Sequence, residues 1–312
     1  MNQTRKNTIA IWGGGSSGIR YEALIKDAGY ETIVLKRDSK KNQFNFNDLD
    51  LSTIKAAVIC TPTIFHSEQS IQFLENNIPV LCEKPISHNL ISGQNIIDTA
   101  IKYQTKFYPG YNQRFLQAYK IFKKNDWGTP ISCESVWAER VSNWQPNKDY
   151  RDSYSVRKEL GGGVPLTLSH DFDWWTGIYN DLKVKEVHSS NNGTLDVSID
   201  THFEIKLEGN ITCNLILDYE ASESNKRYYK VYYEDGSLEY FPLTGDLNFY
   251  WKNGEIQNIP IEKNWKISRI ESFKSTFEYF INDSRHPESL SEWELGLTAL
   301  NVASIVDCWH EK

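Results

Sequence analysis

The stretch "IAIWGGGSSGIRYEALIKDAGYETIVLKRD" at residues 9–38 decides the fold. The apolar run at residues 8–12 stops at a glycine, as a buried parallel strand does. The residues that follow Gly18 place one apolar face on a helix that Gly29 ends: Tyr21, Leu24, Ile25 and Ala28. A second strand is expected at residues 31–35. Strand, glycine turn, helix and strand in succession make a βαβ unit.

The glycine turn between the first strand and the helix has the spacing G-x-G-x-x-G. Gly13 would make the tight turn, Gly15 would let the backbone approach a pyrophosphate, and Gly18 would let helix and strand pack closely. The helix N-terminus would then receive the negative charge. The sequence predicts dinucleotide contacts at five residues: Gly13, Gly15, Ser16, Ser17 and Gly18. The alternative is that a glycine-rich turn is only a turn.

The end of the second strand bears on which dinucleotide is bound. An acid is expected there to bind a ribose hydroxyl, but the sequence reads Lys36, Arg37, Asp38. A guanidinium can grip a 2′-phosphate bidentately, whereas a carboxylate would repel it. Arg37 beside Lys36 therefore favours NADP. The alternative is that Asp38 takes the role of the acid and Arg37 lies over the adenine, which would allow NAD.

Strands and helices continue to alternate as far as about residue 112, which predicts a doubly wound parallel sheet with ligands at the carboxyl ends of its strands. From about residue 129 polar and apolar residues alternate, and "EDGS" and "KNGE" are hairpin signals. A mostly antiparallel open sheet is expected there, followed by helices near 266–282 and 291–310. We predict a Rossmann domain at residues 1–125 and a substrate-binding and oligomerisation α/β domain at residues 126–312.

The tetrapeptide "CEKP" ends a predicted strand on the same edge as the glycine turn. Lys84 should therefore project into the crevice beside the cofactor. A lysine held next to a nicotinamide can have its proton affinity lowered and can exchange a proton with a reacting oxygen. Most lysines are solvated surface charges, and spacing alone does not select this one.

Composition narrows the classes of function. A net charge of −7 without a basic tail or stripe argues against nucleic acid or an anionic membrane as the main partner. Five widely spaced cysteines without a CxxC motif predict neither disulfides nor a zinc site. The histidines outside the candidate site lack metal-ligand spacing, so no metal is expected. No signal peptide or membrane span is indicated, and we expect a cytoplasmic protein.

Five segments in order resemble the Gfo/Idh/MocA family of oxidoreductases: "GGGSSG", "CTPTIFH", "EKP", "YNQRF" and "YRDSYSVRKELGGGVPLTLSHDFDWW". The resemblance covers most of the chain. Within the family, "DYRDSYSVRKELGGG" resembles the members that occur with surface-polysaccharide and nonulosonic-acid sugar biosynthesis.

The resemblance implies a Rossmann domain followed by a domain whose sheet commonly forms a homodimer or homotetramer interface. It implies hydride transfer between NAD(P) and a carbinol carbon of a sugar or polyol. The family's cofactor-side motifs fall on Thr61, Pro62, Thr63 and His66, on Glu83 and Lys84, and on Asn112 and Arg114. The histidine that begins its H-x-x-D helix falls on His170, with Asp173 as the acid.

One departure from the family pattern affects the expected acid–base groups. Many members have an aspartate four residues before the histidine, where this chain has Leu166, with Thr167 nearest. The proton transfer then falls on Lys84 and His170. Asp171 could replace the missing carboxylate, and a solvent-facing or helix-capping role is the alternative.

An aromatic and cationic cluster precedes the triple glycine at residues 161–163. Aromatic faces with guanidinium groups suit a sugar that bears a carboxylate or phosphate. The expected substrate-binding residues are Lys84, His170, Asp171, Trp144, Tyr150, Arg151, Tyr154 and Arg157. The alternative is a solvated loop whose charges nearly cancel, because acidic residues lie nearby.

The sequence thus predicts an NAD(P)-dependent, NADP-preferring oxidoreductase acting on a sugar or sugar acid. Two other classes stay open at this stage. One is a cofactor-binding sensor or regulator without activity, against which the intact Lys84 and His170 argue. The other is a net non-redox enzyme that uses NAD transiently.

Overall fold

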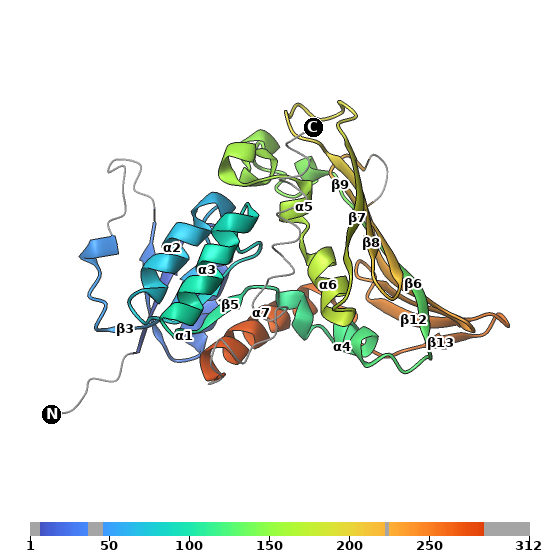
Figure 1. Ribbon diagram of the computed structural model, residues 1–312, viewed down its shortest axis with the longest axis horizontal. Coiled ribbons are helices and arrows are strands. Elements are labelled where there is room, and N and C mark those ends of the chain that lie inside the picture. The colour runs from blue at the N-terminus through green and yellow to red at the C-terminus, as the bar shows by residue number, and fades with distance from the viewer. Residues whose placement is uncertain (1–6, 37–45, 222–224, 284–312) are drawn as a thin grey trace. The chain divides into compact units, whose positions relative to one another are not determined.

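The structure is a computed structural model that describes residues 7–36, 46–221 and 225–283 (Figure 1). The chain divides into two compact units. The first runs to Tyr111 and resumes at Phe273, and the second begins at Asn112 and reaches Ser272. The sequence predicts a domain boundary near residue 125. The compact units, which are defined by contacts within the structure, do not test where the folding domains divide.

The first unit is built on a parallel sheet of five strands in the order β2-β1-β3-β4-β5. Its strands are β1 (Thr8–Trp12), β2 (Glu31–Leu35), β3 (Ile54–Ile59), β4 (Val80–Cys82) and β5 (Phe107–Pro109). The chain passes from β1 to β2 on one side and then returns to β3 on the other. The carboxyl ends of β1 and β3 therefore flank the point where the strand order reverses, which is where such sheets bind ligands.

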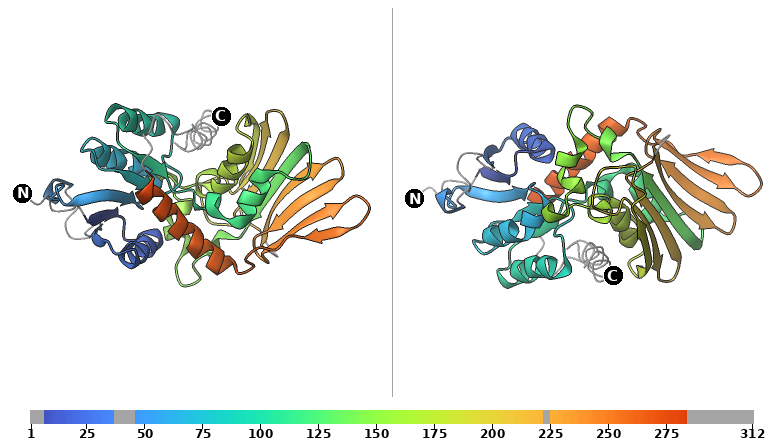
Figure 2. Two further views of the ribbon diagram at one scale, coloured as in Figure 1. Left: turned by 90° about the horizontal axis from the view of Figure 1, so that it is seen from below. Right: turned by 90° about the horizontal axis from the view of Figure 1, so that it is seen from above.

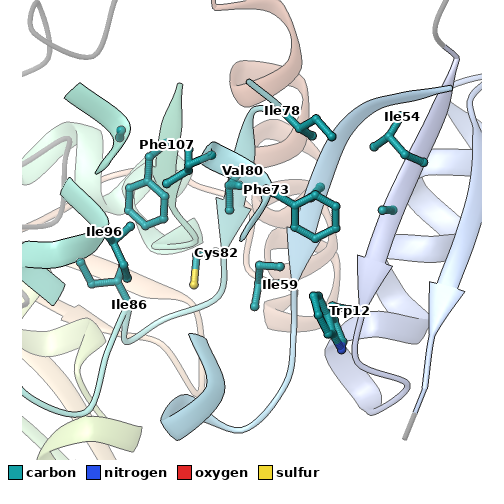
Figure 3. Packing of buried hydrophobic residues seen from close by; sticks show 14 of the residues in the cluster. Trp12, Ile54, Ile59, Phe73, Ile78, Val80, Cys82, Ile86, Ile96 and Phe107 are labelled. Carbon is teal, nitrogen blue, oxygen red and sulfur yellow. The ribbon is translucent and has the colours of Figure 1, made fainter. Parts of the chain in front are cut away.

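Helices cover both faces of this sheet (Figure 2): α1 (Ser16–Asp27), α2 (His66–Leu74), α3 (Leu90–Lys102) and the later part of α7 (Trp265–Asn282). On one face, α2 and α3 pack through Phe73 and Ile96 against strand residues such as Ile59 and Val80 (Figure 3). On the other, α1 packs together with three phenylalanines of α7: Phe273, Phe277 and Phe280. The predicted doubly wound Rossmann fold is confirmed.

The second unit is built on a mixed sheet of eight strands in the order β13-β12-β11-β10-β6-β9-β8-β7. Its strands are β6 (Pro130–Ala138), β7 (Lys183–Ser190), β8 (His202–Glu208), β9 (Thr212–Asp218), β10 (Lys226–Tyr233), β11 (Gly236–Phe241), β12 (Asp246–Trp251) and β13 (Ile256–Asn258). All neighbouring strands are antiparallel except β6 and β9, which are parallel. The predicted, mostly antiparallel sheet is confirmed.

Short helices lie on one face of this sheet (Figure 1): α4 (Gln117–Lys124), α5 (Val164–Thr167) and α6 (His170–Ile178). Two tryptophans of α6 are buried in the interface. Trp174 stacks on Tyr229 of β10 at a centroid distance of 4.1 Å, and the Trp175 indole donates to the Ser135 hydroxyl of β6. These contacts fix α6, and with it His170, on the sheet.

The connections in this unit include single 3-10 turns: η3 (Asn112–Phe115), η4 (Val141–Asn143), η5 (Tyr150–Asp152), η6 (Tyr154–Val156) and η7 (Lys158–Leu160). The connections of the first unit include two further 3-10 turns, η1 (Phe46–Asp48) and η2 (Thr63–Phe65). No helix among the described residues is long and apolar enough to cross a membrane. The same residues contain no cluster of three metal-ligating side chains.

Candidate functional site

The glycine turn after β1 is compressed against the end of β3. A Cβ atom placed on Gly13 would lie 2.5 Å from the Cys60 carbonyl oxygen, and one on Gly18 would overlap the carbonyl oxygen of Gly13. Gly13 also has φ of +122°, a conformation that side chains rarely adopt. Only glycine therefore fits these two positions.

The start of α1 has the features of an anion site. Gly15 is the N-cap residue of α1. Because glycine has no side chain, no side chain at this position accepts a hydrogen bond from the N–H groups of the first helical turn. A Cβ on Gly15 would meet no atom of the described chain within 4 Å. Open space in front of uncapped N–H groups fits a pyrophosphate. Ser16 and Ser17 form the first turn of this helix.

The side chain of Lys36 lies against the glycine turn. A Cβ on Gly14 would lie 2.9 Å from its Cγ. An ammonium group at this place complements a phosphate bound at the turn. The other two residues expected to choose between NAD and NADP, Arg37 and Asp38, lie outside the described residues.

His66 joins the ends of β3 and β4. Its Nδ1 lies 2.8 Å from the Pro85 carbonyl oxygen and its Nε2 lies 2.7 Å from the Thr61 carbonyl oxygen. The ring is 1% exposed, and burial lowers its pKa although both carbonyl oxygens oppose the shift. A neutral ring can donate to only one of them. His66 therefore donates one hydrogen bond, to Pro85 or to Thr61 according to its tautomer, and its ring lies between the two loops.

The loop that His66 holds carries Lys84. Glu83 follows β4 and is 9% exposed, and its Oε2 accepts a hydrogen bond from the Lys84 backbone N–H at 3.2 Å. The Lys84 side chain is half-buried, and its positive charge contributes to the low pKa of His66. Thr61 donates through Oγ1 to Gln69 at 2.6 Å, and Pro62 and the buried Thr63 follow it. The glycine turn, the Thr61 loop and Lys84 thus all follow carboxyl ends of neighbouring parallel strands.

In the second unit His170 is the first residue of α6 and is 9% exposed. Its ring stacks on Trp137 of β6, with a centroid distance of 6.4 Å and an interplanar angle of 19°. The imidazole thus lies nearly parallel to the indole, an arrangement that suits a group presenting one ring nitrogen to a substrate.

Asp171 is fully buried, so the solvent-facing interpretation is wrong. Its Oδ1 accepts a hydrogen bond of 2.7 Å from the Tyr229 hydroxyl, which also lies 3.1 Å from Gln113 Oε1. Burial raises the pKa of Asp171, and the charge of Arg227 opposes the rise. The carboxyl group points into the sheet interface, where it anchors α6.

Asn112 and Arg114, expected near the cofactor, both have partners inside the second unit. Arg114 pairs with Asp173 through Nε at 3.0 Å and Nη2 at 2.5 Å, and both side chains are 2% exposed. Asn112 donates to the Ser272 hydroxyl at 2.8 Å. Burial raises the pKa of Asp173, although Arg114 opposes this. The motif residues Arg114 and Asp173 thereby join η3 to the first turn of α6.

The cationic cluster ahead of the triple glycine is compensated by acids. Arg151 pairs with Asp149 at 2.6 Å and Asp196 at 3.0 Å, and Arg157 pairs with Glu159 at 2.7 Å. Both arginines, with Glu159 and Asp196, line an open surface pocket of about 220 Å³. The aromatic members also have partners: Trp144 packs on Tyr219, the Tyr150 hydroxyl accepts from the Asp196 N–H, and Tyr154 is half-buried in η6.

Arg227 is a candidate site residue that the sequence reasoning missed. It lies on β10 opposite Trp137 and is 8% exposed, with its guanidinium carbon 3.7 Å from the centre of the Trp137 ring. A signal existed in the sequence. Arg227 is in phase with Tyr229, Val231 and Tyr233, the buried side of an alternating strand, where a charged residue is unexpected.

Part of the first unit is similar to a known protein family. Residues 28–111 match the Gfo/Idh/MocA family model, described as an oxidoreductase family with an NAD-binding Rossmann fold. This part of the chain is therefore similar to the NAD-binding Rossmann fold of that family, and the matched residues contain the Thr61 loop, His66 and Lys84.

Curated relatives align with part of the chain. Myo-inositol 2-dehydrogenase of Thermotoga maritima is 29% identical over 147 residues, which are 47% of this chain and 42% of the relative. Glucose-6-phosphate 3-dehydrogenase of Bacillus subtilis is 24% identical over 187 residues, 55% of this chain and 53% of the relative. The chain thus spans about half the length of the curated relatives it matches.

The whole fold has counterparts among solved structures. UDP-N-acetylglucosamine 3-dehydrogenase of Acidithiobacillus ferrooxidans superposes with a TM-score of 0.74, covering 96% of this chain and 95% of the other, at 16% identity. At this identity the likeness establishes the fold, which is a Rossmann unit followed by a unit with a large mixed sheet.

Proposed function

We propose that this chain, whose first unit matches the NAD-binding Rossmann fold of the Gfo/Idh/MocA oxidoreductases, is an NAD(P)-dependent sugar oxidoreductase. It would transfer hydride to or from a carbinol or keto carbon of a sugar or sugar acid. The observation that carries the proposal is the position of Lys84, which follows β4 on the same sheet edge as the glycine turn and is held there by His66 and Glu83. Relatives named as inositol and glucose-6-phosphate dehydrogenases support the substrate class.

The residues that would hold the cofactor are those of the glycine turn and the start of α1, and the nicotinamide would supply the two-electron hydride acceptor or donor. As the C–H bond of the carbinol breaks, its O–H proton must leave. Lys84 would stabilise the developing alkoxide through its ammonium charge, and His170, oriented by Trp137, would accept the proton. In the reverse direction the same groups return the proton to the new alkoxide.

The preference for NADP is part of the proposal. Arg37 would bind a 2′-phosphate through its guanidinium group, and the adjacent Lys36 would add positive charge at this end of the cofactor. Titration of the protein with NADPH and NADH tests it directly. Tighter binding of NADH would remove the argument from Arg37 and leave the oxidoreductase intact.

We further propose that the substrate is a sugar of the surface-polysaccharide or nonulosonic-acid pathways, on the strength of the segment "DYRDSYSVRKELGGG". We also propose that the chain forms a homodimer or homotetramer through its eight-stranded sheet. A screen of sugar nucleotides and sugar acids tests the first of these.

The central experiment follows the absorbance of reduced nicotinamide with candidate keto sugars. Lys84→Ala should abolish turnover and leave the cofactor dissociation constant within a few-fold. Lys55→Ala is the matched control, because Lys55 is also half-buried but lies at the opposite end of β3. Full activity of the Lys84 variant would overturn the assignment of its role.

The same assay separates the alternatives. A stoichiometric change in nicotinamide absorbance supports the oxidoreductase. Product without net change would indicate transient use of NAD in elimination or glycoside cleavage. Cofactor binding without product across the screen would indicate a sensor.

A further inference from the structure

We infer that Arg227, together with Trp137 and Trp265, binds a negatively charged group of the substrate, a carboxylate or a phosphate. The inference rests on the proposed function for the identity of the substrate as a sugar. The sugar would carry an anionic group, and Arg227 would bind that group.

The first observation is a buried guanidinium without a carboxylate partner. Arg227 is 8% exposed, and its Nε is buried without a hydrogen-bond partner. Within residues 7–36, 46–221 and 225–283, no acid lies within ion-pair distance of this arginine. Its single polar contact is a long one, from Nη2 to the Tyr229 hydroxyl at 3.5 Å. Buried charges are ordinarily paired, so Arg227 retains unused hydrogen-bonding capacity.

The second observation is the aromatic surround. The Arg227 guanidinium carbon lies 3.7 Å from the Trp137 ring centre and 4.9 Å from that of Trp265. Both indoles are half-buried and reach the surface of the unit. Indole faces stabilise the cation without using its N–H donors. The donors thus remain for an oxyanion.

Asp171 is the acid that could serve as the counter-ion of Arg227 in place of a substrate. Its pKa responds to the charge of Arg227, but the two groups are joined only through the Tyr229 hydroxyl. Tyr229 has one proton to donate, so it accepts from Arg227 when it donates to Asp171. Asp171 therefore offsets part of the charge from a distance and leaves the planar fork of the guanidinium unoccupied.

The contrast with the other arginines of this unit supports the assignment. Arg151 and Arg157 are exposed, and their guanidinium groups are engaged by acids of their own loops. Arg114 is buried but paired bidentately with Asp173. Arg227 combines burial with the absence of such a pair, and it shares Trp137 with His170. His170 and Arg227 thus lie against the same indole ring.

A bidentate contact of this kind is charge-assisted and discriminates strongly against a neutral analogue. The test compares wild type with Arg227→Gln and Arg227→Lys on three substrates: a neutral polyol such as myo-inositol, a sugar acid and a sugar phosphate. We expect Arg227→Gln to lower kcat/KM for the anionic sugars at least about 30-fold, mainly through KM, and for the neutral polyol less than about 3-fold. The sugar acid and sugar phosphate distinguish the two anions.

Arg227→Lys keeps the charge but loses the planar fork, so it should rescue part of the lost affinity for the anionic sugars. Arg140→Gln is the control, because this arginine contacts only the Thr194 carbonyl among the described residues. An equal loss on neutral and anionic sugars in both Arg227 variants would show that Arg227 is only the counter-ion of Asp171 and would overturn the inference.

A binding measurement keeps the inference separate from the proposed function. Quenching of tryptophan fluorescence by sugar phosphate and sugar acid, in the presence of oxidised cofactor, should occur in wild type and weaken about 30-fold in Arg227→Gln. Anion binding that depends on Arg227 without any turnover would refute the oxidoreductase and leave this inference standing. Turnover of neutral sugars only, with no anion binding, would support the oxidoreductase and refute the inference about Arg227.

Discussion

Two glycines of the β1–α1 turn should respond differently to the same added methyl group. In Gly18→Ala the Cβ would overlap the Gly13 carbonyl oxygen, so α1 must move away from the turn. We expect a loss of about 1–3 kcal/mol in the free energy of unfolding, as for other overpacked sites, and a large loss of cofactor affinity. In Gly15→Ala the Cβ meets no atom of the described chain, so stability should be kept and cofactor affinity should fall. Urea unfolding and titration with NADPH measure both quantities.

The Gly15 variant is the control for the Gly18 variant, since both add one methyl group to the same turn. Equal stability of the two variants would contradict the close approach between Gly18 and Gly13. Unchanged cofactor affinity in Gly15→Ala would contradict the assignment of the open space to the pyrophosphate.

The buried imidazole of His66 should make stability depend on pH. Burial lowers its pKa below the ordinary value of 6.5. Below pH 6.5 the unfolded chain therefore binds a proton that the folded chain does not, and this contribution weakens stability as the pH falls, by up to about 1.4 kcal/mol per pH unit. The weakening stops at the folded pKa. In His66→Gln this contribution is absent.

Urea unfolding of wild type and His66→Gln at pH 7.5 and pH 5 measures the difference. We expect the stability advantage of wild type to be larger at pH 7.5 than at pH 5. Two stability curves that run parallel through this range would show that His66 titrates normally in the folded protein.

At the scale of elements, one ion pair holds the helix that carries His170. Asp173 lies one turn after His170 and pairs with Arg114 of η3, with both side chains 2% exposed. Asp173→Asn should cost about 3–5 kcal/mol of unfolding free energy, because it leaves a buried guanidinium without its counter-charge. Replacing both residues with leucine should cost less than the two single leucine replacements together. Urea unfolding of the cycle measures the coupling, and additive losses would argue against it.

The regular elements were predictable where one periodicity dominated. The βαβ unit follows from its apolar run, its glycines and one helix face, and β1 and β2 lie where the pattern places them. Polar and apolar residues alternate through residues 194–208, as in a strand, but the strand begins at His202. The Asn191 side chain donates to the Val197 and Ile199 carbonyl groups, which removes those groups from a strand ladder. The parallel pairing of β6 with β9 carries no local signal, because register with a distant strand is a tertiary property.

At the scale of the whole molecule, the candidate site was predictable only as residue types. The order of motifs places Lys84 at the end of β4, and the structure agrees. The sequence could not say which arginines would be neutralised, because Arg151 pairs with Asp196, 45 residues further along the chain. For the same reason it could not show Arg227 without an ion pair. Which charges pair depends on which loops meet in the folded chain, and the sequence does not show this. Which side of a strand a residue lies on follows from the local alternation, so the burial of Arg227 could have been predicted.

The open face of the eight-stranded sheet leads to the last prediction, that the chain self-associates. Among the described residues, α4–α6 cover the face of Tyr229 and Trp137 (Figure 1), and the opposite face carries partly exposed aromatics such as Tyr228, Tyr232 and Tyr250. Sedimentation equilibrium should give two or four times the chain mass of 36.2 kDa.

The double variant Tyr228→Glu/Tyr232→Glu should have the mass of one chain. If two of these sheets packed together, each sheet would have to bury two unpaired charges. Ile91→Glu on α3 is the matched control, since this isoleucine is 75% exposed in the first unit and its replacement should leave the mass unchanged. Aromatic side chains on an alternating strand favour association because part of each ring remains in water in the isolated chain. A wild-type mass of one chain at micromolar concentration would show that these rings serve the single chain alone.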